Sequence, residues 1–94
     1  MAAYLIAEVD VTDTKAYEGY RPLAAASIAR HGGKYIVRGG RTEALEGGPP
    51  NRVVVLEFPT MEAARKFYNS PDYSEARKIR EASSRSRVFL VEGM

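Results

Sequence analysis

The 94-residue sequence contains no cysteine and no tryptophan, and its only histidine is His31. The lack of cysteine excludes disulfides, thiolate metal sites and iron-sulfur clusters, and it fits a cytoplasmic protein. No apolar run approaches the roughly 20 residues that cross a bilayer, and the short apolar start at 2–7 lacks a basic leader. We therefore expect a soluble, unexported, cytoplasmic protein with no membrane partner.

An excess of charge of one sign is also missing, because 14 lysines and arginines stand against 12 aspartates and glutamates. The formal net charge of +2 gives a weak overall field and does not indicate a nucleic-acid partner. The sequence has no repeat, low-complexity tract or linker, so we expect one domain spanning residues 1–94. A domain this small buries well under about 70% of its unfolded surface, so a partner chain would add stability.

Hydrophobic periodicity predicts strands at 4–10, 34–38, 52–58 and 87–92, with helical segments after the first and third strands. Pro22 lies inside the first helical segment and predicts a kink or a two-piece helix. Ser70-Pro71-Asp72 predicts a helix that restarts with serine as its cap. The order β-α-β-β-α-β predicts a ferredoxin-like α+β fold, in which both helices cover one face of a four-stranded antiparallel sheet.

Three of the predicted strands are apolar on both alternating sets of residues, as in Val53-Val54-Val55-Leu56. Two helices cover only one face of such a sheet. The other face needs an apolar cover, or it exposes a larger patch than soluble monomers usually carry. We therefore expect a homodimer through the sheet face.

The chain resembles a known family in segments distributed along nearly its whole length. These segments are Tyr4 to Asp10 with Val11-Thr12-Asp13, Tyr17 and Tyr20, His31-Gly32-Gly33 leading to Val37-Arg38-Gly39-Gly40, Arg52 to Pro59, Phe67 to Tyr73, and Arg80. They look like the bacterial domain of unknown function (DUF) family 1330, in the dimeric α+β barrel superfamily. The resemblance implies a dimer of ferredoxin-like units but no catalytic residue, because the family has no assigned activity.

Relatives in that superfamily include cofactor-free monooxygenases, isomerases, dehydratases and haem-degrading enzymes. This sequence departs from several of them in having one histidine and no tryptophan, which argues against transferring a haem or catalytic-histidine role. It also has no zinc-ligand spacing and no dinucleotide fingerprint, so we expect no cofactor and no metal.

Arg38 is the leading candidate for ligand binding, because it ends a predicted strand beside Gly39-Gly40, where a ligand can approach the backbone. Its guanidinium offers a planar fork for a carboxylate or phosphate. The segment 41–51 would close over that ligand as a lid. The alternative is an ion pair between Arg38 and Glu8, which we place at the same end of the sheet. Glu8, Tyr17 and Tyr20 complete the predicted ligand-binding set.

Two weak catalytic candidates are Glu57 and His31. Glu57 would lie in a dimer cleft, where burial raises a carboxylate pKa, or it would pair with a basic residue across the dimer. His31 has the acid-base range of a general base, or it interacts with the carbonyls at a helix C-terminus. Ser70 resembles a nucleophile only by residue type and is best interpreted as a helix cap.

Three functional classes follow from these observations. The first is a cofactor-free enzyme that acts on a small anionic, carbonyl or aromatic compound, and the second is a binding or regulatory module with the same site. The third is an RNA-binding module, which we rank last because strand 52–58 offers only Phe58 as an aromatic platform. The basic segment 77–87 would hold an anion, or it would form the positive last turn of a helix.

Overall fold

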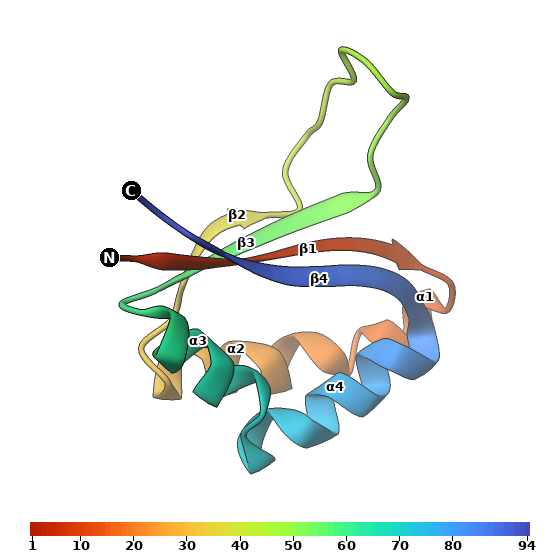
Figure 1. Cartoon of the computed structure of the whole chain (residues 1–94). Helices are drawn as coiled ribbons and strands as arrows, with labels where there is room; N and C mark the ends of the chain where they lie inside the picture. The colour runs from red at the N-terminus through yellow and green to blue at the C-terminus, as the bar shows by residue number, and fades with distance from the viewer.

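Four strands form one antiparallel sheet, and the helices lie together on one of its faces in the computed structural model, which describes residues 1–94 (Figure 1). The strands are β1 (Ala3–Val11), β2 (Lys34–Arg38), β3 (Arg52–Phe58) and β4 (Ser84–Glu92), in the spatial order β2-β3-β1-β4. The helices are α1 (Thr14–Tyr17), α2 (Tyr20–Arg30), α3 (Met61–Tyr68) and α4 (Pro71–Ser83). The predicted ferredoxin-like α+β fold is confirmed.

Alternation along the strands separates an inner face, which the helices cover, from an open outer face. In β1 the odd-numbered residues Leu5, Ala7 and Val9 are buried, whereas the even-numbered residues between them are partly exposed. The register places Leu56 of β3 and Leu90 of β4 opposite Leu5, so these residues share the inner face. Each strand therefore contributes one set of side chains to each face.

A bulge interrupts this alternation in β2. Tyr35 pairs with Leu56, but the next pairs are Val37 with Val55 and Arg38 with Val54. The extra residue moves everything after it to the opposite face. Arg38 therefore lies on the inner face with Tyr35 and Val54.

The predicted break in the first helical segment is observed at Glu18 and Gly19, between α1 and α2. Asp13 caps α1 by accepting a hydrogen bond from the Ala16 N–H at 3.1 Å. Pro22 then falls in the first turn of α2, where a missing N–H leaves no hydrogen bond unmade. The break thus places the proline where a helix tolerates it.

The second helical segment is also divided, as predicted, into α3 and α4. Ser70 is the N-cap of α4, accepting a hydrogen bond from the Tyr73 N–H at 3.3 Å and donating one to the Phe67 carbonyl at 2.7 Å. Proline occupies the start of α4. This confirms the interpretation of Ser70 as a cap.

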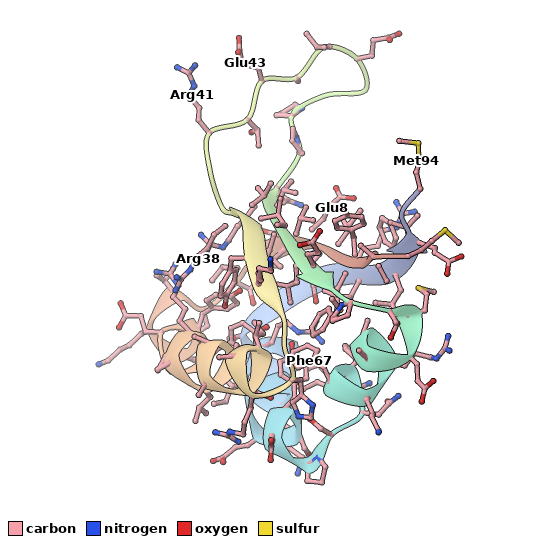
Figure 2. The ribbon with its side chains drawn as sticks, turned by 90° about the vertical axis from the view of Figure 1, so that its left-hand side faces the viewer. Glu8, Arg38, Arg41, Glu43, Phe67 and Met94 are labelled. Carbon is pink, nitrogen blue, oxygen red and sulfur yellow. The ribbon has the colours of Figure 1, made fainter.

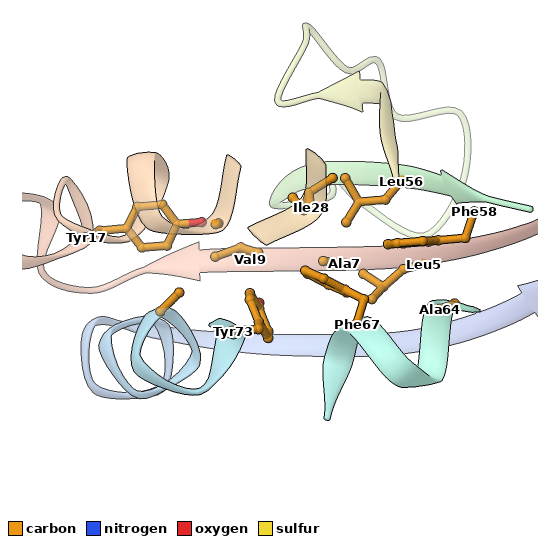
Figure 3. Packing of buried hydrophobic residues seen from close by; sticks show 12 residues of the cluster. Leu5, Ala7, Val9, Tyr17, Ile28, Leu56, Phe58, Ala64, Phe67 and Tyr73 are labelled. Carbon is orange, nitrogen blue, oxygen red and sulfur yellow. The ribbon is translucent and has the colours of Figure 1, made fainter. Parts of the chain in front are cut away.

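Four aromatic rings, from Tyr17, Phe58, Phe67 and Tyr73, pack with aliphatic side chains in the core between the inner face and the helices (Figure 3). The Phe67 ring of α3 lies with its centroid 5.2 Å from that of Phe58 and 4.5 Å from that of Tyr73. Gly33 approaches this cluster so closely that a Cβ there would lie 2.7 Å from the Phe58 ring. The ring contacts of Phe67 join α3 and α4 to β3, an inner strand of the sheet.

The connection between β2 and β3, residues 39–51, projects from the sheet on the side away from the helices (Figure 1). Almost all of its residues are exposed, including Leu45 at 94%. We call this segment the arm.

Candidate functional site

A cavity lies between the inner face of the sheet and the helices, with a volume of about 40 Å³ open to water-sized molecules. That is more than the roughly 10–15 Å³ that one buried water needs. Most lining side chains are apolar or aromatic and come from the sheet, α1, α2, α3 and α4. The charged members are four arginines, Arg21, Arg38, Arg52 and Arg80, and no aspartate or glutamate lines the cavity.

Two of these arginines come from the ends of the hairpin strands. Arg38 ends β2 and lies over the Tyr35 ring, with its Cζ 4.5 Å from the ring centroid. Arg52 begins β3, and its guanidinium lies against Gly39, where any Cβ would overlap it. Gly39 also has φ +65°, a backbone conformation that favours glycine. The Arg52 Nε is buried without a hydrogen-bond partner.

The other two arginines belong to helices and differ in exposure. Arg21 is exposed in the first turn of α2, whereas Arg80 of α4 is only 4% exposed. Arg80 donates hydrogen bonds to the Ser86 hydroxyl and, at 3.4 Å, to the Tyr68 hydroxyl. The cavity therefore extends from exposed arginines at the surface to a buried arginine inside.

Four tyrosines, Tyr17, Tyr20, Tyr35 and Tyr73, also line the cavity. The hydroxyls of Tyr20 and Tyr73 are hydrogen bonded at 2.7 Å. Burial raises the pKa of Tyr17, Tyr20 and Tyr35 above the usual tyrosine value. These phenols therefore stay protonated at neutral pH and can donate hydrogen bonds, but they cannot act as bases.

The structure brings together three of the predicted ligand-binding residues, Arg38, Tyr17 and Tyr20, in this cavity. It does not bring Glu8 to them. Glu8 pairs with Val53 and Arg87 on the outer face, while Arg38 is on the inner face, and the two side chains lie apart in Figure 2. No ion pair joins Glu8 to Arg38, so the expected common site and the alternative ion pair are both corrected.

Glu57 lies on the outer face, opposite Tyr4 of β1 and Lys34 of β2. Its carboxylate accepts a hydrogen bond from the Tyr4 hydroxyl at 3.3 Å and lies 3.7 Å from the Lys34 Nζ. The basic partner that we expected across a dimer is thus present within the same chain. Glu57 does not line the cavity.

His31 is the C-cap residue of α2, which agrees with its interpretation as a helix C-terminal residue. Its Nε2 lies 3.3 Å from a carboxylate oxygen of Asp72, which the Arg30 guanidinium also contacts at 3.0 Å. The Arg30 hydrogen bond, with a further contribution from His31, lowers the Asp72 pKa below its usual value. This exposed cluster joins α2 to α4 and does not line the cavity.

The arm does not close over Arg38. It leads away from the helix layer, with Arg41 and Glu43 pointing into solvent at its far end (Figure 2). The predicted lid is therefore wrong for this conformation, because the arm leaves the sheet on the side of the outer face.

The sequence analysis missed Arg52 as a member of the cavity and considered Arg80 only as part of the basic segment 77–87, although each residue carries a signal. Counting back in twos from Phe58 places Arg52 on the inner face of β3. The buried residues of α4 are Tyr73, Ala76, Arg80 and Ser83, so helical spacing places Arg80 on the buried stripe.

The family model described as "Domain of unknown function (DUF1330)" matches residues 2–94. The chain belongs to the DUF1330 family. No curated protein sequence matches this DUF1330 chain. No helix has the length and apolar character needed to span a membrane. No group of three or more histidine, cysteine or acidic side chains comes together in a way that could hold a metal ion.

Solved structures share the fold of this DUF1330 chain. RPA0582, a protein of unknown function from Rhodopseudomonas palustris, superposes with a TM-score of 0.81 at 23% identity, covering 99% of this chain and 82% of that one. A dimeric ferredoxin-like protein of unknown function from Jannaschia sp. CCS1 gives 0.78 at 10% identity, covering 99% and 100%. SnoaB, a cofactor-independent oxygenase from Streptomyces nogalater, gives 0.71 at 16% identity, covering 99% and 93%. At these identities the comparisons establish the fold alone.

Proposed function

We propose that this DUF1330 protein binds a small organic anion in the cavity between the sheet and the helices. One observation carries the proposal: four arginines line the cavity and no carboxylate does. Guanidinium groups in a partly desolvated site are costly unless an anion compensates them. A carboxylate, enolate or phenolate would supply that charge, and the apolar walls would hold its carbon skeleton.

The size of the cavity limits the ligand. About 40 Å³ is far below the roughly 300–1,000 Å³ of a drug-sized site, so the ligand is small and some lining side chains must move to admit it. We expect the side chains of Arg21 and Arg38 to move, because both are exposed and are held by cation-π contacts rather than by ion pairs. A single-ring acid is the largest guest that we expect.

The chemistry of the lining favours binding a ligand that is already ionised. The raised pKa of Tyr17, Tyr20 and Tyr35 keeps these phenols protonated, and neither of the catalytic candidates, Glu57 and His31, lines the cavity. The arginines would lower the pKa of an acidic phenol or enol that enters the cavity. Our proposal therefore gives Glu57 and His31 no catalytic role.

Cofactor-free turnover is a second candidate, favoured by the likeness of fold to SnoaB, whose name describes a cofactor-independent oxygenase. In such a reaction the arginines and tyrosine hydroxyls of this chain would stabilise an oxyanion of the substrate. Oxygen consumption with a panel of phenolic and quinol compounds separates turnover from binding alone.

We also propose that two copies of the chain associate through their outer sheet faces. The outer face exposes Val37, Phe89 and Val91, and Ile36 at the adjoining bulge is also exposed, which is unusual for a soluble monomer. Structural neighbours with this fold are described as dimeric. The arm would then extend beside the partner copy, because it projects on the same side.

Calorimetric titration with sodium benzoate, and with the neutral isostere benzamide, tests the anion proposal. We expect benzoate to bind and benzamide to bind much more weakly. Arg38→Lys keeps the charge but loses the bidentate fork, so it should weaken benzoate binding by about tenfold or more, or ~1.4 kcal/mol. Arg65→Lys on α3 is the matched control, because Arg65 is exposed and does not line the cavity. Equal binding of benzoate and benzamide would reject the proposal.

A further inference from the structure

Arg80 is a buried cation without an anionic partner. It is only 4% exposed, yet none of the four ion pairs in the molecule includes it. Its Nη1 and Nη2 donate to the neutral hydroxyls of Ser86 and Tyr68, and its Nε is buried with no hydrogen-bond partner. A buried guanidinium held only by neutral groups is costly, because the charge loses its hydration without gaining a counter-ion.

Arg80 also occupies a boundary between two spaces. On one side is the largely apolar cavity, and on the other is an open cleft of about 360 Å³ between α4 and β4. Arg80 lines both, and the rest of the cleft is mainly polar, with Tyr68, Glu81, Ser84 and Ser86 in its wall. An acid that reaches this boundary can place its charged group at Arg80 and its apolar part in the cavity.

No neighbouring acid in the cleft compensates the charge of Arg80. Glu81 is the one acid in the cleft, and its carboxylate lies 3.5 Å from the Arg77 Nε, so it is engaged by another cation. The Ser84 hydroxyl is held by the backbone carbonyl of Arg80. The Ser86 and Tyr68 hydroxyls already touch the guanidinium and could turn to donate to a bound oxyanion.

We propose that Arg80 binds the carboxylate of a small organic acid at this boundary and thereby acts as the anchor of the ligand site. This inference rests on the proposed binding function and names the residue and the ligand class. Arginine presents its Nε and one Nη in a fork that matches a carboxylate. The Nε is buried and has no hydrogen-bond partner, so it is the donor that a carboxylate inside the site would use together with one Nη.

The direct test follows the Arg80 Nε–Hε signal of the unmodified protein by NMR during titration with benzoate, benzamide or inorganic phosphate. We expect benzoate to shift this signal and benzamide to leave it unchanged. Phosphate should bind at least fivefold more weakly than benzoate, because it has no apolar part for the cavity. An Arg80 signal that benzoate does not move would overturn the proposal, and phosphate binding as tight as that of benzoate would overturn the choice of an organic acid.

A substitution supplies the second test. Arg80→Met keeps an unbranched apolar stem, shorter than the arginine side chain, and removes its charge, so benzoate binding should fall more than tenfold while the midpoint of urea unfolding stays the same or rises. Lys78→Met makes the same change of charge on the exposed side of α4 and should leave both quantities unchanged. If Arg80→Met does not fold, Arg80→Lys should fold and bind benzoate more weakly than the unmodified chain.

These outcomes separate the two proposals. If Arg38→Lys weakens benzoate binding but Arg80→Met does not, the cavity binds anions and Arg80 is not their anchor. If the unmodified chain does not bind benzoate at all, both proposals fail.

Discussion

The two faces of the sheet differ in what covers them. On the inner face, alternate strand residues such as Leu5, Leu56 and Phe58 are buried under four helices. The cavity that remains between the sheet and the helices is lined by four arginines. On the outer face, Phe89 and Val91 remain 39% and 43% exposed, although they continue equally apolar strands. Strands that are apolar on both sides indicate that both faces of the sheet need to be covered. The helices of this chain cover only the inner face.

A pair of phenylalanines tests this difference most strongly. Phe67 is 1% exposed between Phe58 and Tyr73, so Phe67→Ala should lower the free energy of unfolding by about 3–5 kcal/mol. Phe89→Ala on the outer face removes the same ring from a much more exposed position and should cost less than about 1 kcal/mol in dilute protein. Urea unfolding at several protein concentrations measures both. Equal losses in dilute protein would mean that the outer face is packed as tightly as the inner one.

A charge on the outer face tests whether a second copy covers it. Val55 is opposite Ile6 near the middle of that face, so Val55→Lys should raise the dissociation constant of the proposed dimer on the order of 100-fold, or ~3 kcal/mol. Ala26→Lys adds the same charge to the exposed side of α2 and should not change the dimer. Sedimentation velocity measures the oligomeric state. A monomeric unmodified chain at micromolar concentration would contradict the dimer.

A smaller loss of stability is expected when the N-cap of α4, Ser70, is removed. Ser70→Ala removes the hydrogen bonds to the Tyr73 N–H and the Phe67 carbonyl, so it should cost around 1 kcal/mol of unfolding free energy. Benzoate affinity should not change, because Ser70 does not line the cavity. Thr60→Ala removes the exposed cap of α3 and is the control for the loss of a cap hydrogen bond. Lost affinity at unchanged stability would give the Ser70 hydroxyl a chemical role.

The smallest effect concerns Asp72 of α4, whose exposed carboxylate contacts Arg30 and His31 at the end of α2. The Arg30 hydrogen bond lowers the Asp72 pKa in the folded state, so the carboxylate contributes stability above its unfolded pKa of about 3.9 and loses it as the pH falls through the lower, folded value. Asp72→Asn should therefore be less stable than the unmodified chain near pH 6, and the difference should shrink below pH ~4. Glu75→Gln, on the same helix and in no ion pair, should show no such convergence. Thermal unfolding between these pH values measures both variants.

Much of the fold could be predicted from local patterns. The bounds of β2 follow from a strand-forming run between Gly33 and Gly39, and those of β3 follow from a β-branched run that ends at Pro59. The division of both helical segments follows from Pro22 and from Ser70-Pro71. These features depend on neighbours in the sequence, so the sequence alone determines them. The same is true of the doubly apolar strands, whose residue pattern by itself indicates a sheet face that the helices leave uncovered.

The membership of the site was decided by tertiary structure. Strict alternation places Arg38 on the same face as Lys34 and hence on the outer face with Glu8, but the bulge between Tyr35 and Val37 turns Arg38 inward. The bulge therefore separates Arg38 from Glu8, which we expected in the same site, and places Arg38 at a cavity that no acid lines. Arg52 and Arg80 join Arg38 there from β3 and α4, because packing brings together residues that no local pattern connects. The sequence determined which elements form, whereas the bulge and the packing of the helices decided which charges meet.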